Sequence, residues 1–228
     1  MGDSRRYLPS AGHDWLLPFY DPVLKLLGEE RVKGELIVQA GIRARHRVLD
    51  IGCGTGTLAI LVKRRHPGAE VVGLDPDPKA LARARRKAEA AGVAIRFDEG
   101  FANELPHPDA SFDRVFSSLM FHHLERDAKL ATLRELRRVI APGGSLHLLD
   151  FGPPRSRLDR ALAHVFHGGD ELRDNVEGKI PVFLTDAGFE GANEVGHRTT
   201  IFGGLSYWRA SQPAGGGCAS PTRGAEPA

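Results

Sequence analysis

The chain has 228 residues, a length that suits one domain with a substantial core. Charged residues make up 26% and hydrophobic residues 41%, the balance of a soluble globular protein, and a net charge of +2 is too small to indicate a nucleic-acid partner. Two cysteines, Cys53 and Cys218, are too few for a disulfide framework, and no run approaches the ~20 apolar residues of a membrane-spanning helix. The polar first residues lack the apolar run of a signal peptide, so we expect a cytoplasmic protein.

Residues 1–46 precede the first predicted strand, and we expect them to form a helical cap or lid. An apolar and aromatic cluster occupies residues 15–20, and residues 23–40 then predict one or two helices interrupted by Gly28 and Gly34. The cluster has two interpretations: core packing against the main domain, or a lid whose apolar face closes over a substrate. Both stay open at the level of sequence.

The next hundred residues alternate strands with helices. Strands are predicted at residues 48–51, 71–74, 94–97, 113–117 and 145–150. Helices are predicted from residue 57 to the basic run at 63–65, over 79–91, and over 127–140, where the sequence Ala-Pro-Gly-Gly at 141–144 is expected to stop the helix. This order predicts a parallel sheet with helices on both faces. The basic run at 83–87 is interpreted as a solvated helix face rather than a nucleic-acid patch.

After residue 151 the alternation changes. Helices are expected at 157–166 and 180–187, and strands at 194–197 and 205–209. Because no full helix separates the last two strands, they are predicted to pair as antiparallel neighbours. Residues 211–228 are rich in glycine and proline, which predicts a disordered tail.

A strand followed by a glycine-rich turn and a helix is the central feature of the sequence. Asp50 ends the strand, and the turn contains Gly52, Cys53, Gly54 and Gly56. Glycines let a ligand approach the backbone, and the following helix turns its positive end toward the same place. The dinucleotide fingerprint G-x-G-x-x-G is incomplete, because a threonine replaces its third glycine. A carboxylate before the turn suits an ammonium group better than a pyrophosphate.

A second acid, Asp75, ends the next strand about twenty residues further on. A carboxylate at this place can accept hydrogen bonds from both hydroxyls of a ribose. Nicotinamide-dependent enzymes use the same arrangement, so Asp75 indicates a nucleoside without identifying it. A helix N-cap is the alternative interpretation.

These features resemble the first motif of the class I S-adenosylmethionine (SAM) dependent methyltransferases, and the resemblance extends over residues 48–151. It implies an α/β Rossmann-like fold with a mostly parallel seven-stranded sheet and an antiparallel edge pair, in a methyltransferase domain at 47–210. It also implies SAM as cofactor. The residues that would bind it are Asp50, Gly52, Cys53, Gly54, Gly56, Asp75, Pro76, Phe101, Ala102, Ser117 and Ser118.

The loop at 100–106 resembles the adenine loop of this family, with one departure. Phe101 stands where an acid is common, so it is expected to pack on the adenine ring while the backbone of Ala102 reads the ring edge. Asp98 or Glu99 is a candidate for the missing acceptor. The resemblance places Ser117 and Ser118 near the methionine part of SAM.

Two adjacent histidines, His122 and His123, are candidates for a general base. Adjacent side chains usually diverge, so at most one is expected to face the site, and a surface or capping pair is the alternative. His164, Asp150 and the hydroxyl of Tyr20 are further candidates. His164 and a second histidine three residues later could form half a metal site, but no third ligand is evident, so no metal is predicted.

The predicted function is methyl transfer from SAM to an oxygen, nitrogen or carbon nucleophile on a small, hydrophobic molecule. The segment at 117–124 resembles that of small-molecule methyltransferases such as the ubiquinone and menaquinone biosynthesis enzymes. The alternatives are an NAD(P)-dependent oxidoreductase and a non-catalytic SAM-binding protein. The sequence indicates neither a nucleic-acid partner nor a particular oligomeric state.

Overall fold

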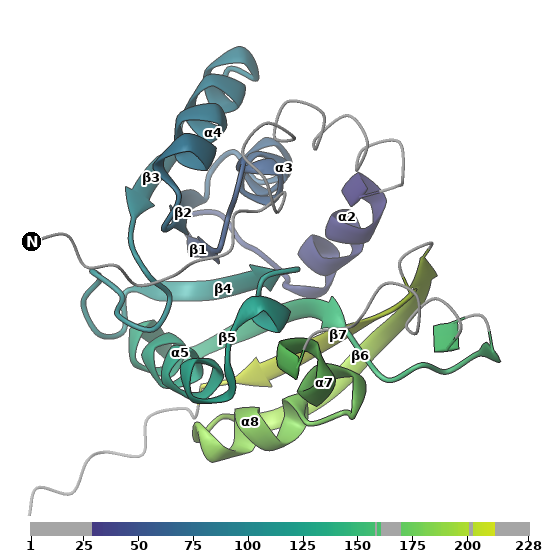
Figure 1. Cartoon of the computed structure of the whole chain (residues 1–228). Helices are drawn as coiled ribbons and strands as arrows, with labels where there is room; N and C mark the ends of the chain where they lie inside the picture. The colour runs from purple at the N-terminus through teal and green to yellow at the C-terminus, as the bar shows by residue number, and fades with distance from the viewer. Residues whose placement is uncertain (1–28, 158, 161–169, 201–202, 213–228) are drawn as a thin grey trace, which may run out of the picture.

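The computed structural model describes residues 29–157, 159–160, 170–200 and 203–212 (Figure 1). Its strands are β1 Arg47–Ile51, β2 Glu70–Asp75, β3 Arg96–Glu99, β4 Phe112–Ser118, β5 Ile140–Phe151, β6 Glu190–Thr200 and β7 Gly203–Ser211. Its helices are α2 Glu29–Gln39, α3 Thr57–Arg65, α4 Pro78–Ala90, the 3-10 turn η2 Phe121–His123, α5 Arg126–Val139, α7 Asp170–Val176 and α8 Ile180–Asp186. No helix in these ranges is long and apolar enough to cross a membrane.

The strands form one seven-stranded sheet in the order β3-β2-β1-β4-β5-β7-β6. The first five strands in this order are parallel, and β7 runs antiparallel to both β5 and β6. The chain steps from β1 to β2 on one side and later returns to β4 on the other, so the strand order reverses beside β1. In parallel sheets such a reversal opens a crevice at the carboxyl ends of the strands, where ligands bind. The mostly parallel sheet with an antiparallel edge pair is the predicted fold.

Two apolar cores cover the two faces of the sheet. Figure 1 shows α2, α3 and α4 on one side and α5, α7 and α8 on the other. Val48 belongs to the core under α2 and α3, whereas the adjacent Leu49 belongs to the core under α5 and α8. Burial on both faces explains the uninterrupted apolar run of this strand. The cores hold the carboxyl ends of β1, β2, β4 and β5 at one edge, where the candidate site residues lie.

The structure differs from the sequence-based prediction in two elements. Strand β5 begins at Ile140, directly after α5, although residues 141–144 were expected to form a stop. Phe112 pairs with Ile140 and Arg114 pairs with Ser145. Residues 141–144 therefore form an irregularity within the ladder between β4 and β5 and do not end the strand. Helix α2 also continues through Gly34, where an added Cβ would lie 2.7 Å from the guanidinium of Arg65.

Several predicted segments lie outside the described residues. They are the apolar cluster at 15–20, most of the helix expected at 157–166, and all but the first two residues of the tail expected at 211–228. Helix α7 was not predicted, because its seven residues are too few to show a helical period.

Candidate cofactor and active site

The glycine turn after β1 has the backbone conformation that its sequence indicates. Gly52, Gly54 and Gly56 have φ values of 59°, 53° and 77°, in the left-handed region that favours glycine. A Cβ on Gly52 would lie 2.2 Å from Cγ of Met120, which follows β4. The turn is therefore packed directly against the chain that leads into η2.

Asp50 is a buried carboxylate with an unused oxygen. Its Oδ2 has no hydrogen-bond partner within the described part of the chain. Burial raises its pKa to about 7, while the charge of Lys33 and the backbone N–H of Ala59 offset part of that rise. Buried acceptors are normally satisfied, so Oδ2 fits a donor supplied by a ligand. An ammonium group on an amino-acid ligand meets this requirement, as SAM does.

Lys33 is a charged side chain near this site that sequence reasoning missed. It is buried on α2, and its Nζ lies 2.5 Å from Oε1 of Glu29. In the sequence, Glu29 and Lys33 have the i, i+4 spacing that is common for ion pairs on exposed helix surfaces. Nothing in the sequence therefore indicated that this pair is buried. Its charge acts on Asp50, which places an ammonium close to the end of β1.

Asp75 shapes the turns at the ends of β1 and β2. Its carboxylate accepts hydrogen bonds from the N–H of Gly54 at 2.8 Å and of Asp77 at 2.9 Å, and burial raises its pKa although these bonds act in the opposite direction. Asp77, not Asp75, caps helix α4 by accepting from the N–H of Lys79. Pro76 lies between the two acids. The remaining lone pairs of Asp75 stay available to a ribose.

Cys53 has a structural position in the turn. Its N–H donates to the carbonyl of Leu74 at 3.0 Å, which ties the turn to β2. Its thiol is buried, and burial raises the thiol pKa well above its ordinary value, so it is no nucleophile at neutral pH.

The candidate adenine loop is held by helix α5. Glu135 accepts from the N–H of Leu105 at 2.9 Å, and Arg138 donates to the carbonyl of Leu105 at 3.1 Å. Phe101 and Ala102 in this loop are half-buried. The anchoring pair Glu135 and Arg138 was not recognised from sequence, because an i, i+3 ion pair on a helix is ordinary.

Asp98 and Glu99, the candidates for an adenine acceptor, differ in their surroundings. Asp98 is engaged by Arg96 at 2.8 Å and by Nε2 of His107 at 3.0 Å. Glu99 is exposed at the end of β3. Both carboxylate oxygens of Asp98 are thus already engaged by side chains of the protein, which makes Asp98 a poorer acceptor for adenine.

Ser117 and Ser118 end β4 beside the glycine turn. Ser117 is the register partner of Ile51 on β1, and Ser118 is the partner of Leu149 on β5. Both hydroxyls are buried, and neither has a hydrogen-bond partner within the described residues. They add two polar groups without partners to the crevice that Asp50 lines.

A histidine–aspartate pair lies at the next strand end. Nδ1 of His122 is 2.7 Å from Oδ1 of Asp150, and the backbone N–H of His122 donates to Oδ2 at 3.2 Å. Burial alone would raise the pKa of Asp150, but the charge and hydrogen bonds of His122 and the N–H of Phe151 lower it below its usual value. An ionised carboxylate only accepts, so Nδ1 carries a proton, and in the neutral form of the ring the lone pair lies on Nε2. Two residues predicted separately therefore act as one unit.

The expectation that adjacent histidine rings diverge was wrong. The rings of His122 and His123 have centroids 4.0 Å apart at an interplanar angle of 43°. The 3-10 turn η2 brings them together, because its side chains advance less along the axis than those of a strand. His123 is exposed, and only His122 contacts Asp150.

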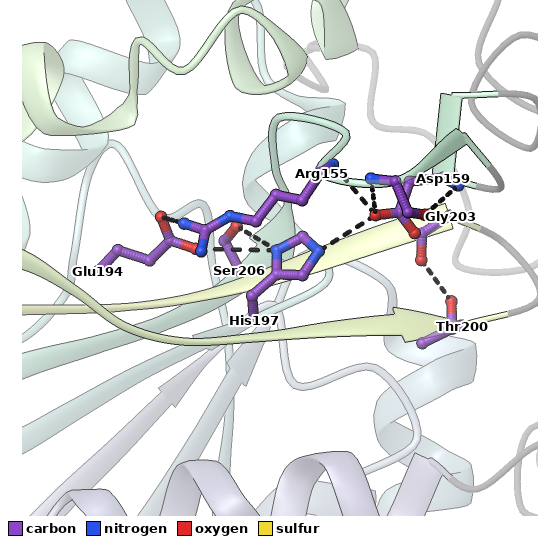
Figure 2. Close-up of polar contacts among 8 residues, drawn as sticks. Arg155, Asp159, Glu194, His197, Thr200, Gly203 and Ser206 are labelled. Carbon is purple, nitrogen blue, oxygen red and sulfur yellow. Dashed lines mark hydrogen bonds and ion pairs between the residues drawn. The ribbon is translucent and has the colours of Figure 1, made fainter.

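A second histidine–aspartate pair follows in the edge hairpin (Figure 2). Nε2 of His197 lies 3.4 Å from Oδ2 of the buried Asp159, and its Nδ1 lies 3.4 Å from the hydroxyl of Ser206 and 3.8 Å from Oε1 of Glu194. Arg155 forms an ion pair with Glu194. This pair was not anticipated from sequence, because His197 was interpreted only as part of a strand.

The two pairs are neighbours with different accessibility. Ser206 on β7 is the register partner of both Asp150 on β5 and His197 on β6, so the three side chains lie on one face of the sheet. Both ring nitrogens of His197 face protein groups. Nε2 of His122, in contrast, has no polar partner within the described part of the molecule. The first pair is therefore the one suited to proton transfer.

Other candidates from the sequence are not placed. Tyr20 and His164, with the histidine three residues after it, lie outside the described residues. Among the residues that are described, no group of three or more histidine, cysteine or acidic side chains could hold a metal ion.

Comparison with known proteins identifies relatives. Residues 48–144 match the family described as "Methyltransferase domain". The chain is 45% identical over 142 residues to demethylmenaquinone methyltransferase of Thermus thermophilus, covering 61% of this chain and 64% of that protein. The corresponding protein of Deinococcus radiodurans is 40% identical over 154 residues, covering 66% and 63%. The chain thus spans slightly less than two thirds of these two relatives. Probable methyltransferase ltbC of Aspergillus luteorubrus is 30% identical over 194 residues, covering 75% and 68%.

Solved structures share the fold. YcgJ of Bacillus subtilis aligns with a TM-score of 0.65 at 21% identity, covering 81% of this chain and 99% of that one. A SAM-dependent methyltransferase of Aquifex aeolicus aligns with a TM-score of 0.61 at 21% identity, covering 84% and 97%. The chain therefore belongs to the methyltransferase family, and it shares the fold of these solved structures.

Proposed function

We propose that the protein transfers a methyl group from SAM to a nucleophile on a small molecule. The observation that carries this proposal is the buried Asp50, whose Oδ2 has no partner among the described residues and borders a turn where a Cβ on Gly52 would clash with Met120. A nicotinamide-dependent oxidoreductase would not need a carboxylate there, and neither the family nor the relatives support that alternative or a non-catalytic protein.

The chain's own residues divide the work of holding the cofactor. Asp50 would receive the ammonium of the methionine part and Asp75 the ribose, while the ammonium of Lys33 suits the carboxylate. Ser117 and Ser118 offer hydroxyls beside the turn. SAM supplies an activated methyl group on a sulfonium. The protein then contributes mainly position and exclusion of water, which can be worth ~7–11 kcal/mol.

The base that we propose is His122. Asp150 fixes its tautomer and orientation, so Nε2 can accept a proton from a hydroxyl on the acceptor. The Phe151 ring packs against the imidazole in a T-shaped contact, with a centroid distance of 5.0 Å, and shields it. His123 is exposed, whereas His122 pairs with the buried Asp150, so His122 is the stronger candidate. A lid role for Tyr20 and its apolar neighbours remains part of the proposal, as does the division into a cap at 1–46 and a main domain at 47–210.

The acceptor class that we propose is a hydrophobic molecule with an ionisable hydroxyl, such as a quinol. A histidine base is useful only where a proton must leave, which a quinol or phenol requires. Two relatives carry the name demethylmenaquinone methyltransferase, which agrees with a ring of this kind.

Calorimetry tests the proposal. SAM and S-adenosylhomocysteine should bind and NAD should not, and Asp50→Asn should weaken binding of both sulfur compounds by at least about tenfold through loss of a charge-assisted hydrogen bond. Asp186→Asn, an exposed aspartate at the end of α8, is the matched control and should bind like the wild type. Tight binding of NAD without binding of the sulfur compounds would refute the proposal.

A further inference from the structure

Asn175 on α7 is a buried amide without a partner in the part of the chain that the structure describes. Its side chain is fully buried, and neither Oδ1 nor Nδ2 makes a hydrogen bond to a described residue. Burying an amide without partners is unfavourable, and native proteins rarely leave both of its polar atoms unsatisfied. The missing partner is therefore best supplied by a bound molecule.

The position of α7 directs this amide toward the active site. Leu172 and Asn175 are buried three residues apart and so share one helix face. Helix α7 packs against η2 and β5, which carry His122 and Asp150, and Figure 1 shows α7 beside the end of β5. The face with Leu172 and Asn175 is buried, which agrees with its being turned toward these two elements.

The other polar side chains of α7 that are described have partners outside this face. Arg173 pairs with Glu177, and Asp174 pairs with Lys179 at 3.1 Å. Packing also fixes the end of the helix, because a Cβ on Gly178 would lie 3.2 Å from Cγ of Pro153. Asn175 is thus an unsatisfied group on an element that is otherwise satisfied and firmly placed.

We propose, on the basis of the methyltransferase function above, that Asn175 binds the methyl acceptor through a hydroxyl group on an aromatic ring. An amide offers donors and an acceptor side by side, and a hydroxyl is the small group that satisfies both. An ammonium only donates and would leave Nδ2 without a partner. The aromatic ring of Phe151 beside His122 suits a flat ring rather than a charged chain.

The test compares two ligands and two matched asparagine variants. The probes are 1,4-dihydroxynaphthalene and 1,4-dimethoxynaphthalene, which lacks the hydroxyl hydrogens, titrated without oxygen into protein saturated with S-adenosylhomocysteine. The wild type should bind the dihydroxy probe at least about tenfold more tightly than the dimethoxy probe. In Asn175→Leu this ratio should fall several-fold, to the smaller preference that the contact of a hydroxyl with His122 alone provides, and in Asn193→Leu, an exposed asparagine on β6, it should persist.

Stability provides an independent readout. Removing an amide that has no partner should leave the melting temperature of Asn175→Leu unchanged or higher, and S-adenosylhomocysteine should bind this variant as it binds the wild type. A melting temperature lower by more than about 4 °C would show that the amide is satisfied in the folded protein and would overturn the inference.

Other outcomes separate the two proposals. If Asn175→Leu and Asn175→Ala both keep the full wild-type preference for the dihydroxy probe, or if the wild type does not bind that probe, the assignment of Asn175 is wrong although the methyltransferase function stands. If the wild type fails to bind S-adenosylhomocysteine, it is the proposed function that fails.

Discussion

At the scale of single residues, burial changes the pKa values of the carboxylates in this site. The pKa of Asp50 is raised to about 7, chiefly because burial penalises its charged form. A carboxylate in the unfolded chain has a pKa near 3.8. Between these values the folded protein holds a proton that the unfolded chain has lost, so stability falls as pH rises.

We expect the cofactor-free protein to lose stability as pH rises from about 4 to about 7. The contribution of Asp50 to this loss should be on the order of a few kcal/mol. Asn cannot ionise, so Asp50→Asn should remove this pH dependence and be more stable than the wild type at pH 8. Urea denaturation of both proteins across this range measures the effect. Parallel pH profiles for the two proteins would contradict it.

The His122–Asp150 pair gives a prediction about rate. His122→Ala should lower the rate of methyl transfer to a quinol by roughly 10²- to 10⁴-fold, because the proton acceptor is lost. Asp150→Asn should also lower it, since an amide no longer fixes the tautomer. Single-turnover measurements with bound SAM test this, with His123→Ala as control and S-adenosylhomocysteine affinity as a check on folding. Equal rates for the two alanine variants would assign the proton transfer elsewhere.

At the scale of elements, the chain that leaves β5 is fastened to the edge hairpin. Ser156 and Asp159 form a capping box, because the hydroxyl of Ser156 accepts from the N–H of Asp159 and Oδ2 of Asp159 accepts from the N–H of Ser156. His197 on β6 contacts the same carboxylate (Figure 2). One carboxylate thus connects the start of a helical turn to a strand that lies far away in sequence.

We expect Asp159→Asn to destabilise the protein by about 1–2 kcal/mol, because it weakens the cap and the contact with His197. Ser156→Ala should lower the free energy of unfolding by about 1 kcal/mol. The double variant with both substitutions should lower it by less than the sum of the two single effects, because each substitution disrupts the same capping box. Equilibrium denaturation gives these values. The exposed Asp186→Asn should change stability by less than about 0.5 kcal/mol. Additive effects of the two changes would show that the capping box is not a unit.

At the scale of the whole molecule, local patterns predicted the fold and the cofactor side of the site. Strand β1, the glycine turn and Asp75 lie within a short stretch, and their periodicity and turn chemistry are visible in sequence. The sheet and its antiparallel edge followed from the order of the elements, and the structure confirms them.

The acceptor side was less predictable, because its contacts join distant segments. Asp150 and His122 were both candidates, but their pairing depends on β4 and β5 lying side by side. Lys33 forms an i, i+4 pair with Glu29, a spacing that is typical of ion pairs on exposed helix surfaces. Asparagine, the residue type at position 175, is common in loops. Nothing local shows that these two side chains are buried.

The contact between Gly52 and Met120 joins the two halves of the crevice mechanically. A single methyl group added at position 52 has no free volume to occupy, so it must displace the segment that carries His122. A substitution in the glycine turn would then also displace His122, although no charged group has been changed. A change on either side of this contact therefore requires a compensating change on the other side.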